Sequence, residues 1–307
     1  FLFFVTLKFY KPTLTLRLKV NNKVKKFFKK LLPSIFSSGI TQINILIGTI
    51  IASYEAGAVS YLYYADRIYQ INLAIAGIAV GTVSLPALSK AFKNKNIKKL
   101  SNIQSKSFEL SLLLSIPASL GLILASEEIV NSLFGYGSFS EKDVKLTADA
   151  LKYFGYGVPA FALVKILSNF FFARDNTKTP LYISIFMVII NISISVSLFA
   201  SYGFIIIPIA TSISTWIGVL IYIYLLNEKN SLLLNKKLIP NFIKILTSTI
   251  IMSIIMVLLI NNYESYLNYS YKFKAIYLLS IVGFVGIVYL LSCYLFGILK
   301  LKNYKTN

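Results

Sequence analysis

The sequence predicts an all-α polytopic membrane protein with eight transmembrane helices. Apolar residues make up 56% of the 307-residue chain, and its mean hydropathy is +0.71. Only 14% of the residues are charged, and long stretches carry no charge at all, which is typical of helices that cross a bilayer. Basic residues concentrate in short connections between these stretches, and basic connections alternate with connections that are not basic.

Each predicted span is an apolar stretch long enough to cross the hydrocarbon core, which takes about 20 helical residues. The uncharged stretch between Lys178 and Glu228 is too long for one span and is expected to form two spans joined by a tight turn at Ser201-Tyr202-Gly203. The connection 127–146 mixes apolar and acidic residues and predicts a short helix at the outer surface. The eight predicted spans are residues 31–54, 59–88, 107–126, 147–172, 180–200, 204–227, 240–261 and 275–299.

The distribution of basic residues predicts the orientation. The segment before the first span and the connection from Lys90 to Lys99 are strongly basic, whereas the connection between them carries only Glu55. Because basic connections stay in the cytoplasm, we expect both the leading segment and the C-terminus there. The connection with Lys272 and Lys274 is the exception to the alternation.

These features predict four segments. Residues 1–30 comprise an apolar start (residues 1–7), interpreted as the end of an earlier helix, and a basic cytoplasmic segment. Residues 31–228 form a six-helix unit, 229–239 a cytoplasmic linker, and 240–307 a final helix pair with a tail. Pro240 suits the first turn of its helix. Because the chain starts at Phe1, we hypothesise that it is the C-terminal part of a longer protein.

Composition also excludes classes of function. A net charge of +20 favours nucleic-acid binding in a soluble basic domain, but here the charges lie between apolar spans and are interpreted as topology signals and lipid-headgroup contacts. The chain has a single cysteine, Cys293, which excludes an internal disulfide. It has no histidine, which excludes zinc sites that use histidine and acid–base catalysis by histidine. No cofactor is expected, although a coupling ion or the membrane potential stays open as a driving force.

The strongest candidate for function is Arg67, one of three arginines in the chain, inside a predicted span. An arginine at the centre of a membrane helix costs roughly 2.5–3.5 kcal/mol on insertion scales and usually faces a cavity or a partner. Arg67 shares a helix face with Tyr63 and Gln70, and Asp66 shares one with Gln70. This polar strip predicts an anion-binding surface, because the guanidinium can donate two parallel hydrogen bonds to phosphate. An internal ion pair that fixes helix packing is the alternative.

Two further features lie in the spans. Gly77 and Gly81 are four residues apart, which predicts close packing against another helix or, alternatively, a hinge. Lys165 lies about 10 Å from the cytoplasmic end of its span at the helical rise. It can therefore either reach the headgroups or line a cavity.

The segment from Phe172 to Pro180 predicts a compact cytoplasmic turn. Pro180 suits the first turn of the next helix, and Thr179 is expected to be its cap. A capped connection accounts for most of this segment. Its candidate motif residues are Arg174, Asp175, Thr177, Lys178 and Pro180.

The run GAVSYLYYADRIYQ…GIAVGTVSLPALSKAF, from Gly57 to Phe92, resembles the lipid II flippase family of bacterial peptidoglycan synthesis, the MurJ/MviN proteins. The turn FFARDNTKTP, from Phe171 to Pro180, resembles a second motif of that family. The resemblance implies the fold of the MOP exporter superfamily, with two six-helix lobes around a cavity and two extra helices that form a lipid groove. This chain would supply the second lobe and the extra pair, and the first lobe would be missing.

By position, the family's cavity Asp-Arg pair matches Asp66 and Arg67, and a polar residue that often follows matches Gln70. The family's usual Leu-Pro is Ile71-Asn72 here, so a proline kink is absent or shifted. The turn motif usually reads Arg-Gln-Asp, whereas this chain has Arg174-Asp175-Asn176.

The resemblance implies flipping of lipid-linked peptidoglycan precursor across the bacterial inner membrane by alternating access, without bond making or breaking. Arg67 would bind the diphosphate or a sugar-linked carboxylate, Asp66 would hold Arg67 or a neighbouring cation, and the undecaprenyl tail would lie along the last two spans. Expected partners are this lipid-linked substrate, membrane lipids, the missing lobe and cell-wall synthesis proteins. Open alternatives are another exporter of the superfamily, a non-transporting interaction protein, and a membrane glycosyltransferase, which the acidic residues of 127–143 weakly allow.

Overall fold

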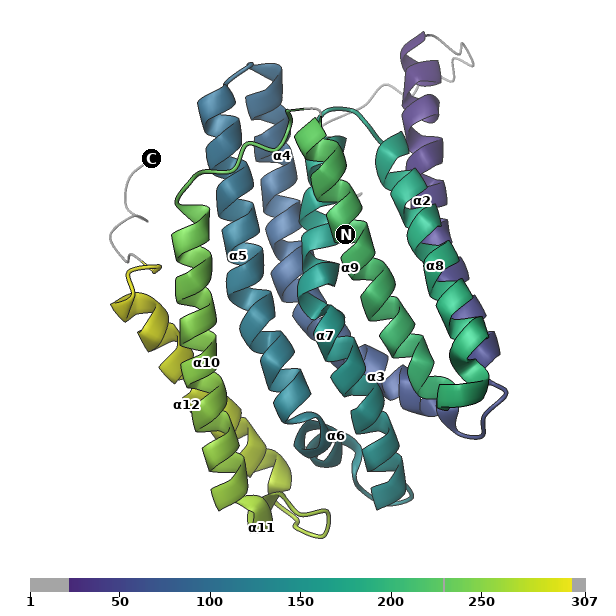
Figure 1. The fold of residues 1–307 in the computed structure, drawn as a ribbon, viewed down its shortest axis with the longest axis vertical. Helices are drawn as coiled ribbons and strands as arrows, with labels where there is room; N and C mark the ends of the chain where they lie inside the picture. Colours follow the sequence, from purple (N-terminus) through teal and green to yellow (C-terminus); the bar gives the residue numbers. More distant parts are fainter. Residues whose placement is uncertain (1–21, 229, 300–307) are drawn as a thin grey trace, which may run out of the picture.

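The structure is a computed structural model that describes residues 22–228 and 230–299. In this part of the chain, helices joined by turns and short connections are the regular structure, and there are no strands (Figure 1). Six helical stretches in it are long and apolar enough to cross a membrane, so the chain is a multi-pass membrane protein. The helices are α2 (Asn22–Ala52), α3 (Ala58–Leu73), the π-helix η1 (Ala74–Ala79), α4 (Val80–Lys93), α5 (Ile97–Leu124), α6 (Ser126–Phe134), α7 (Glu141–Phe172), α8 (Lys178–Tyr202), the 3₁₀ turn η2 (Gly203–Ile205), α9 (Ile206–Glu228), α10 (Leu238–Asn262), α11 (Glu264–Leu267) and α12 (Lys274–Leu295).

Helix α7 is the centre of the bundle (Figure 1). It packs against α3–α4 and α5 on one side and against α9 on the other, while α2 and α8 lie side by side beyond α9 and the pair α10 and α12 lies outside α5. One end of the bundle carries the lysine-rich α4–α5 connection and is called the basic end. The opposite end carries α6 and α11.

The sequence of α7 explains its central position. Small residues such as Gly155 and Ala160 let neighbouring helices approach closely. Pro159 lacks an N–H and so leaves the carbonyl of Gly155 without its helical donor. The hydroxyl of Ser119 on α5 donates to that carbonyl at 2.7 Å, and Trp216 on α9 donates to the neighbouring carbonyl of Tyr156 at 3.0 Å. The break in α7 is therefore closed by the helices on either side.

Helix α12 attaches to α5 in the same way. Pro117 inside α5 frees the carbonyl of Leu113, and the buried hydroxyl of Tyr289 on α12 donates to it at 2.7 Å. A carbonyl exposed to lipid without a donor costs several kcal/mol. The proline and the tyrosine together thus fix where the final helix pair docks.

The structure confirms the tight turn in the long uncharged stretch, because Gly203 adopts φ 62° between α8 and α9. It also confirms the short helix in the 127–146 connection, which is α6. Two helices differ in extent from the predicted spans. Within the described residues, α2 already includes Asn22, inside the segment that was expected to precede the first span, because lysine is a good helix former. Helix α12 ends at Leu295 rather than at 299, before Gly297 with φ 72°.

The connection between α9 and α10 lies against the basic end of α5. The buried side chain of Gln104 donates to the carbonyl of Ser231 at 3.1 Å and accepts from the N–H of Leu233 at 2.8 Å. Asn235 adds bonds to Ser101 and to Ser105, at 2.9 and 2.8 Å. The connection before α10 is thus fixed to α5, and α10 begins at Leu238 with Pro240 in its first turn.

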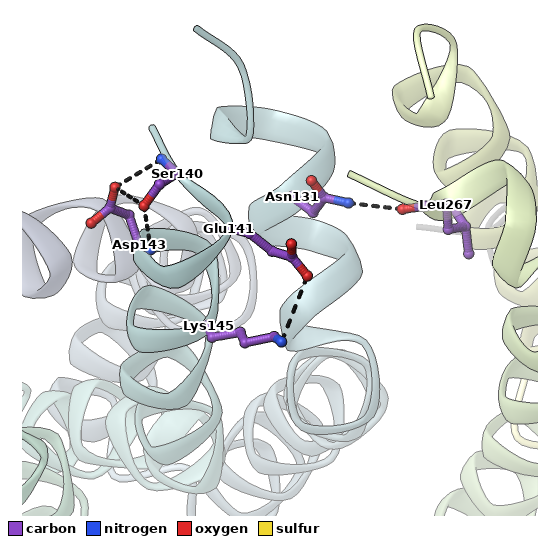
Figure 2. Close-up of polar contacts among 6 residues, drawn as sticks. All are labelled: Asn131, Ser140, Glu141, Asp143, Lys145 and Leu267. Atoms are coloured by element: carbon purple, nitrogen blue, oxygen red, sulfur yellow. Dashed lines mark hydrogen bonds and ion pairs between the residues drawn. The ribbon is translucent and has the colours of Figure 1, made fainter. Parts of the chain in front are cut away.

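At the opposite end, Lys274 is completely buried. Its ammonium donates to the side-chain oxygen of Asn131 at 2.9 Å and to the carbonyls of Gly135 and Tyr269 at 2.6 and 2.8 Å. The amide of Asn131 in turn donates to the carbonyl of Leu267 at 2.8 Å (Figure 2). The interpretation of Lys274 as a basic residue of a surface connection was therefore wrong: it attaches α12 to α6, and its charge is satisfied inside the protein.

Candidate functional site

The candidate site lies on α3, which is followed by a π-helix instead of a proline kink. The π-helix covers Ala74–Ala79, and the chain bends between α3 and α4 (Figure 1). A Cβ atom on Gly77 would lie 3.1 Å from the Cα of Ala162 on α7, so glycine permits the close approach there. Such π-bulges bend helices and often occur at functional sites. The helix bend that a proline near Ile71-Asn72 would cause is thus shifted toward Gly77, where the π-helix causes it.

One face of α3 is fixed against α7. Ala65 and Ile68 are buried, and the ring of Tyr69 lies between those of Phe154 and Phe161, with centroid distances of 4.7 and 5.2 Å. This packing determines the rotation of α3 and therefore the direction of its polar residues.

Arg67 lies on the exposed face. Its guanidinium carbon is 4.7 Å from the ring centroid of Tyr63, which is 53% exposed. Within the described part of the chain, Arg67 forms no salt bridge with Asp66. Instead Asp66 accepts a hydrogen bond from the side chain of Gln70, and the hydroxyl of Tyr69 lies close to the same carboxylate.

This arrangement separates the two charges of the Asp-Arg pair. The carboxylate of Asp66 is directed to the partners Gln70 and Tyr69, whereas the guanidinium of Arg67 rests on Tyr63 and keeps its N–H groups available. The structure contains no ion pair between Asp66 and Arg67, although both are described. An arginine on an aromatic face is suited to bind a phosphate or a carboxylate in two-bond geometry.

Lys165 is exposed on α7, and its stem packs beside Gly77. Gly77 lies about 15 Å further along the helix than Arg67 at the helical rise. The structure therefore does not bring Lys165 together with Arg67, Asp66 and Gln70.

The turn after α7 contains a clamp centred on Arg174. Its guanidinium donates to the carbonyls of Phe170 at 2.6 Å and Ser231 at 2.7 Å, and its carbon is 5.6 Å from the ring centroid of Phe92. One arginine thereby ties the ends of α4 and α7 to the connection before α10. Asp175 follows in the left-handed region, with φ 59°.

The expected cap of α8 was wrong. Asn176, not Thr179, caps the helix: its side-chain oxygen accepts from the N–H of Thr179 at 3.1 Å. Thr177 stands at the N-cap position without a side-chain bond, and Lys178 is the first helical residue and exposed. Asparagine one residue earlier captures the free N–H because its amide reaches further into the first turn. Pro180 lies in the first turn, as predicted, and is buried.

Sequence reasoning missed Gln104, Tyr289 and Lys274. Lys274 had a signal, because it belonged to the one connection that broke the alternation of basic charge. Gln104 and Tyr289 had none, since their partners are backbone groups more than a hundred residues away.

Comparison with known proteins extends this picture. The family model "Lipid II flippase MurJ" matches residues 1–278. The chain is 37% identical over 286 residues to a probable lipid II flippase MurJ of Rickettsia prowazekii (strain Madrid E), covering 92% of this chain and 56% of the relative. It is 41% identical over 205 residues to the corresponding protein of Rhizobium meliloti (strain 1021), covering 67% of this chain and 38% of the relative.

Solved structures agree with these relatives. Lipid II flippase MurJ in an inward closed conformation matches with a TM-score of 0.72 and 26% identity, over 91% of this chain and 56% of that one. A multidrug resistance MATE family transporter of the MOP superfamily, in an outward-facing conformation, shares the fold, with a TM-score of 0.60 and 16% identity over 87% of this chain and 62% of that one. This chain spans about half the length of the relatives it matches. With the family model covering most of its residues, the chain belongs to the lipid II flippase MurJ family.

Proposed function

We propose that this chain is part of a transporter that flips lipid II across the bacterial inner membrane by alternating access. The proposal rests on membership of the family and on the exposed guanidinium of Arg67, which has its N–H groups free because Asp66 is bonded to Gln70 instead. A lipid-linked diphosphate presents the paired oxygens that a guanidinium binds with two hydrogen bonds. Transport by these residues involves no covalent chemistry.

In the proposed topology, eight spans cross the membrane: α2, α3–α4, α5, α7, α8, α9, α10 and α12. The first six form the lobe 31–228, and the connection 229–239 leads to the pair α10 and α12 in 240–307. The basic end lies in the cytoplasm, together with the C-terminus, according to the charge of the α4–α5 connection. The tail of the lipid substrate lies along α10 and α12, whose surfaces carry many exposed aliphatic side chains, such as Ile254 and Leu279.

Arg67 forms one wall of the proposed cavity, and a second six-helix lobe provides the opposite wall. Lys165 acts apart from Arg67, nearer the basic end. It either contacts the substrate after the substrate has moved along the cavity, or its ammonium reaches the lipid headgroups. The turn residues Arg174, Asp175, Thr177, Lys178 and Pro180 position helices and do not touch the substrate.

The test replaces Arg67 in the full-length protein of the organism. We expect Arg67→Ala to abolish growth complementation at a normal protein level, and Arg67→Lys to be impaired as well, because an ammonium cannot form the paired hydrogen bonds. Tyr63→Phe, which keeps the ring beneath the guanidinium, is the matched control and should complement. Transport is then measured directly as the appearance of labelled lipid II in the outer leaflet.

Full complementation by Arg67→Ala would contradict the binding role and favour a packing or interaction role for the motif. Retained growth with loss of labelled lipid II at the outer leaflet would point to another lipid-linked substrate of the same superfamily.

A further inference from the structure

An open cavity of about 490 Å³ lies at the end of the bundle opposite the basic end, and its lining residue Tyr64 stands about one helical turn before Arg67 on α3. It is formed by the start of α3, the α6–α7 loop and the first turn of α7. Its volume is within the range of small-molecule sites, which is about 300–1,000 Å³. Aromatic rings dominate the lining, with Tyr61, Tyr64, Tyr136 and Phe139 around the single carboxylate of Asp143.

The walls of this cavity are fixed from both sides. The hydroxyl of Tyr61 donates to Asp143 at 2.8 Å. A Cβ atom on Gly57 would lie 2.7 Å from that hydroxyl, so only glycine leaves room for it. Behind the α6–α7 loop, Lys274 holds the carbonyl of Gly135, and the hydroxyl of Tyr269 donates to the carbonyl of Phe139. A site whose walls are fixed before binding loses little entropy when a ligand enters.

The charge of the cavity is negative. Both oxygens of Asp143 accept from neutral donors. Oδ1 accepts from the hydroxyl of Tyr61, and Oδ2 accepts from the hydroxyl and the N–H of Ser140 (Figure 2). Among the described residues, Asp143 forms no salt bridge, while the nearby Lys145 is paired with Glu141 at 3.6 Å. The exposed Lys142, next to Asp143 in the chain, acts on the carboxylate through space but forms no salt bridge with it among the described residues. The aromatic faces and the carboxylate together attract a cation, because the ring quadrupole and the carboxylate charge act in the same direction.

The same loop already binds an ammonium group of the protein itself. The ammonium of Lys274 lies 4.3 Å from the ring centroid of Tyr136 and 4.7 Å from that of Tyr269, with three oxygen acceptors around it. Tyr136 also lines the cavity. The ring and carbonyl chemistry of this loop is thus suited to alkylammonium groups.

We propose that this cavity binds an alkylammonium group, held over the rings of Tyr61 and Tyr64 with Asp143 as the counter-charge. The volume exceeds that of the ammonium alone and leaves room for the group that carries it. A zwitterionic phospholipid headgroup and a free amine of a soluble or transported molecule share this chemistry. Asp143 holds the proposed ligand and Arg67 is not among the lining residues, so the site does not depend on the function proposed above.

The test uses the full chain in nanodiscs of phosphatidylglycerol, which has no ammonium group. Choline and its neutral isostere 3,3-dimethyl-1-butanol are titrated and followed by saturation-transfer NMR. We expect choline to bind roughly tenfold more tightly or better, since the two differ in charge and hardly in shape. Equal binding of the isostere, or binding of neutral N-acetylglucosamine without binding of choline, would overturn the proposal.

Variants locate the site. Asp143→Asn keeps an acceptor for the helix cap but removes the charge, and we expect it to weaken choline binding about tenfold. Asp143→Glu restores the charge and should recover most of the affinity. Glu141→Gln removes a charge from the same turn of α7 that points elsewhere (Figure 2) and should change the affinity less than twofold. Unchanged binding by Asp143→Asn would place the cation elsewhere and contradict the proposal.

A lipid arm distinguishes the sources of the ammonium. If the natural ligand is a phospholipid headgroup, adding phosphatidylethanolamine to the nanodiscs should displace choline from the unmodified chain and have no such effect in Asp143→Asn. Choline binding that phosphatidylethanolamine leaves unchanged assigns the site to an amine that is not part of a phospholipid.

Discussion

Single residues in this protein act mainly through buried backbone groups, and Lys274 is the clearest case. Its ammonium has three oxygen acceptors and two aromatic rings, but no carboxylate among the described residues lies within salt-bridge distance. Such a residue is costly to replace, because its acceptors remain buried when it is gone.

Lys274→Met should therefore lower the stability of the protein by about 3 kcal/mol or more, as the buried acceptors lose their donor. The measurement is the thermal unfolding midpoint in detergent. Lys272→Met, which removes an exposed lysine two residues earlier, is the control and should stay within about 0.5 kcal/mol of the original chain. Equal effects of the two substitutions would mean that the contacts of Lys274 contribute no stability.

Glu128 on α6 gives a prediction about pH. Burial is the main cause that raises the pKa of its carboxyl above the ordinary value, and the nearby carboxylates Glu127 and Glu264 add to it. The folded state thus retains the proton to higher pH than the unfolded state, so stability falls as pH rises from the ordinary glutamate value to the raised one.

Replacing this side chain by a neutral one removes the effect. Glu128→Gln should raise the unfolding midpoint at neutral pH and make no difference at a pH below the ordinary glutamate value, where the carboxyl is protonated in both states. Glu141→Gln, which removes an exposed carboxylate that is not among the causes of the shift, is the control. A gain for Glu128→Gln that is as large in acid as at neutral pH would contradict a charge effect.

At the scale of the helix, prolines and a π-helix interrupt the spans, and neighbouring helices repair the interruptions. Pro159 frees a carbonyl that Ser119 satisfies, and Pro117 frees one that Tyr289 satisfies. These bonds join α5 to α7 and α12 to α5.

A double-mutant cycle tests the repair of α7. Ser119→Ala alone should cost about 1–3 kcal/mol, because the carbonyl of Gly155 is left buried without a donor. In a Pro159→Ala background, the new N–H supplies that donor, and Ser119→Ala should cost less than half as much. Unfolding midpoints of the four chains give the coupling, and additive effects would show that proline and serine act independently.

The π-helix determines the rotation of α3 relative to α4. Deleting Ile78 would turn η1 into ordinary α-helix and rotate the residues before it by about 100°. Arg67 would then leave its present face, and we expect growth complementation to be lost at a normal protein level. Ile78→Ala removes the same exposed side chain without the rotation and should complement. Complementation by the deletion variant would show that the orientation of Arg67 is not critical.

At the scale of the whole molecule, the pair α10 and α12 is attached to α5, α6 and α7 at both ends. Gln104 and Arg174 bind the connection before α10 at the basic end, while Lys274 holds α12 at the opposite end. Tyr289 adds an attachment in between. The pair is therefore joined to the rest of the bundle at both ends and in the middle.

Loosening one attachment should expose the connection to protease. In Gln104→Ala the N–H of Leu233 loses its acceptor, and the carbonyl of Ser231 loses the donor on Gln104. Trypsin cleavage after Lys236 and Lys237 should therefore be roughly tenfold faster. The readout is the rate at which the C-terminal fragment appears. Gln42→Ala, an exposed glutamine on α2, is the control, and equal cleavage rates would argue against the attachment.

The sequence by itself determined the all-helical membrane class, the turn at Gly203 and the presence of a costly arginine in α3. Apolar runs, charge alternation and glycine are local signals, and each depends only on neighbouring residues and the thickness of the bilayer. The apolar segment 1–7 and the tail after 299 lie outside the described residues, and the predicted roles of Arg67, Asp66 and Gln70 stay predictions.

Only the tertiary structure decided how the polar groups pair. It directed Asp66 to Gln70 instead of Arg67, made Arg174 a clamp between three segments, buried Lys274 and formed the cavity at Asp143. These outcomes follow from which backbone carbonyls and rings meet across the bundle. Since their partners come from distant parts of the chain, no spacing along the sequence contains that information.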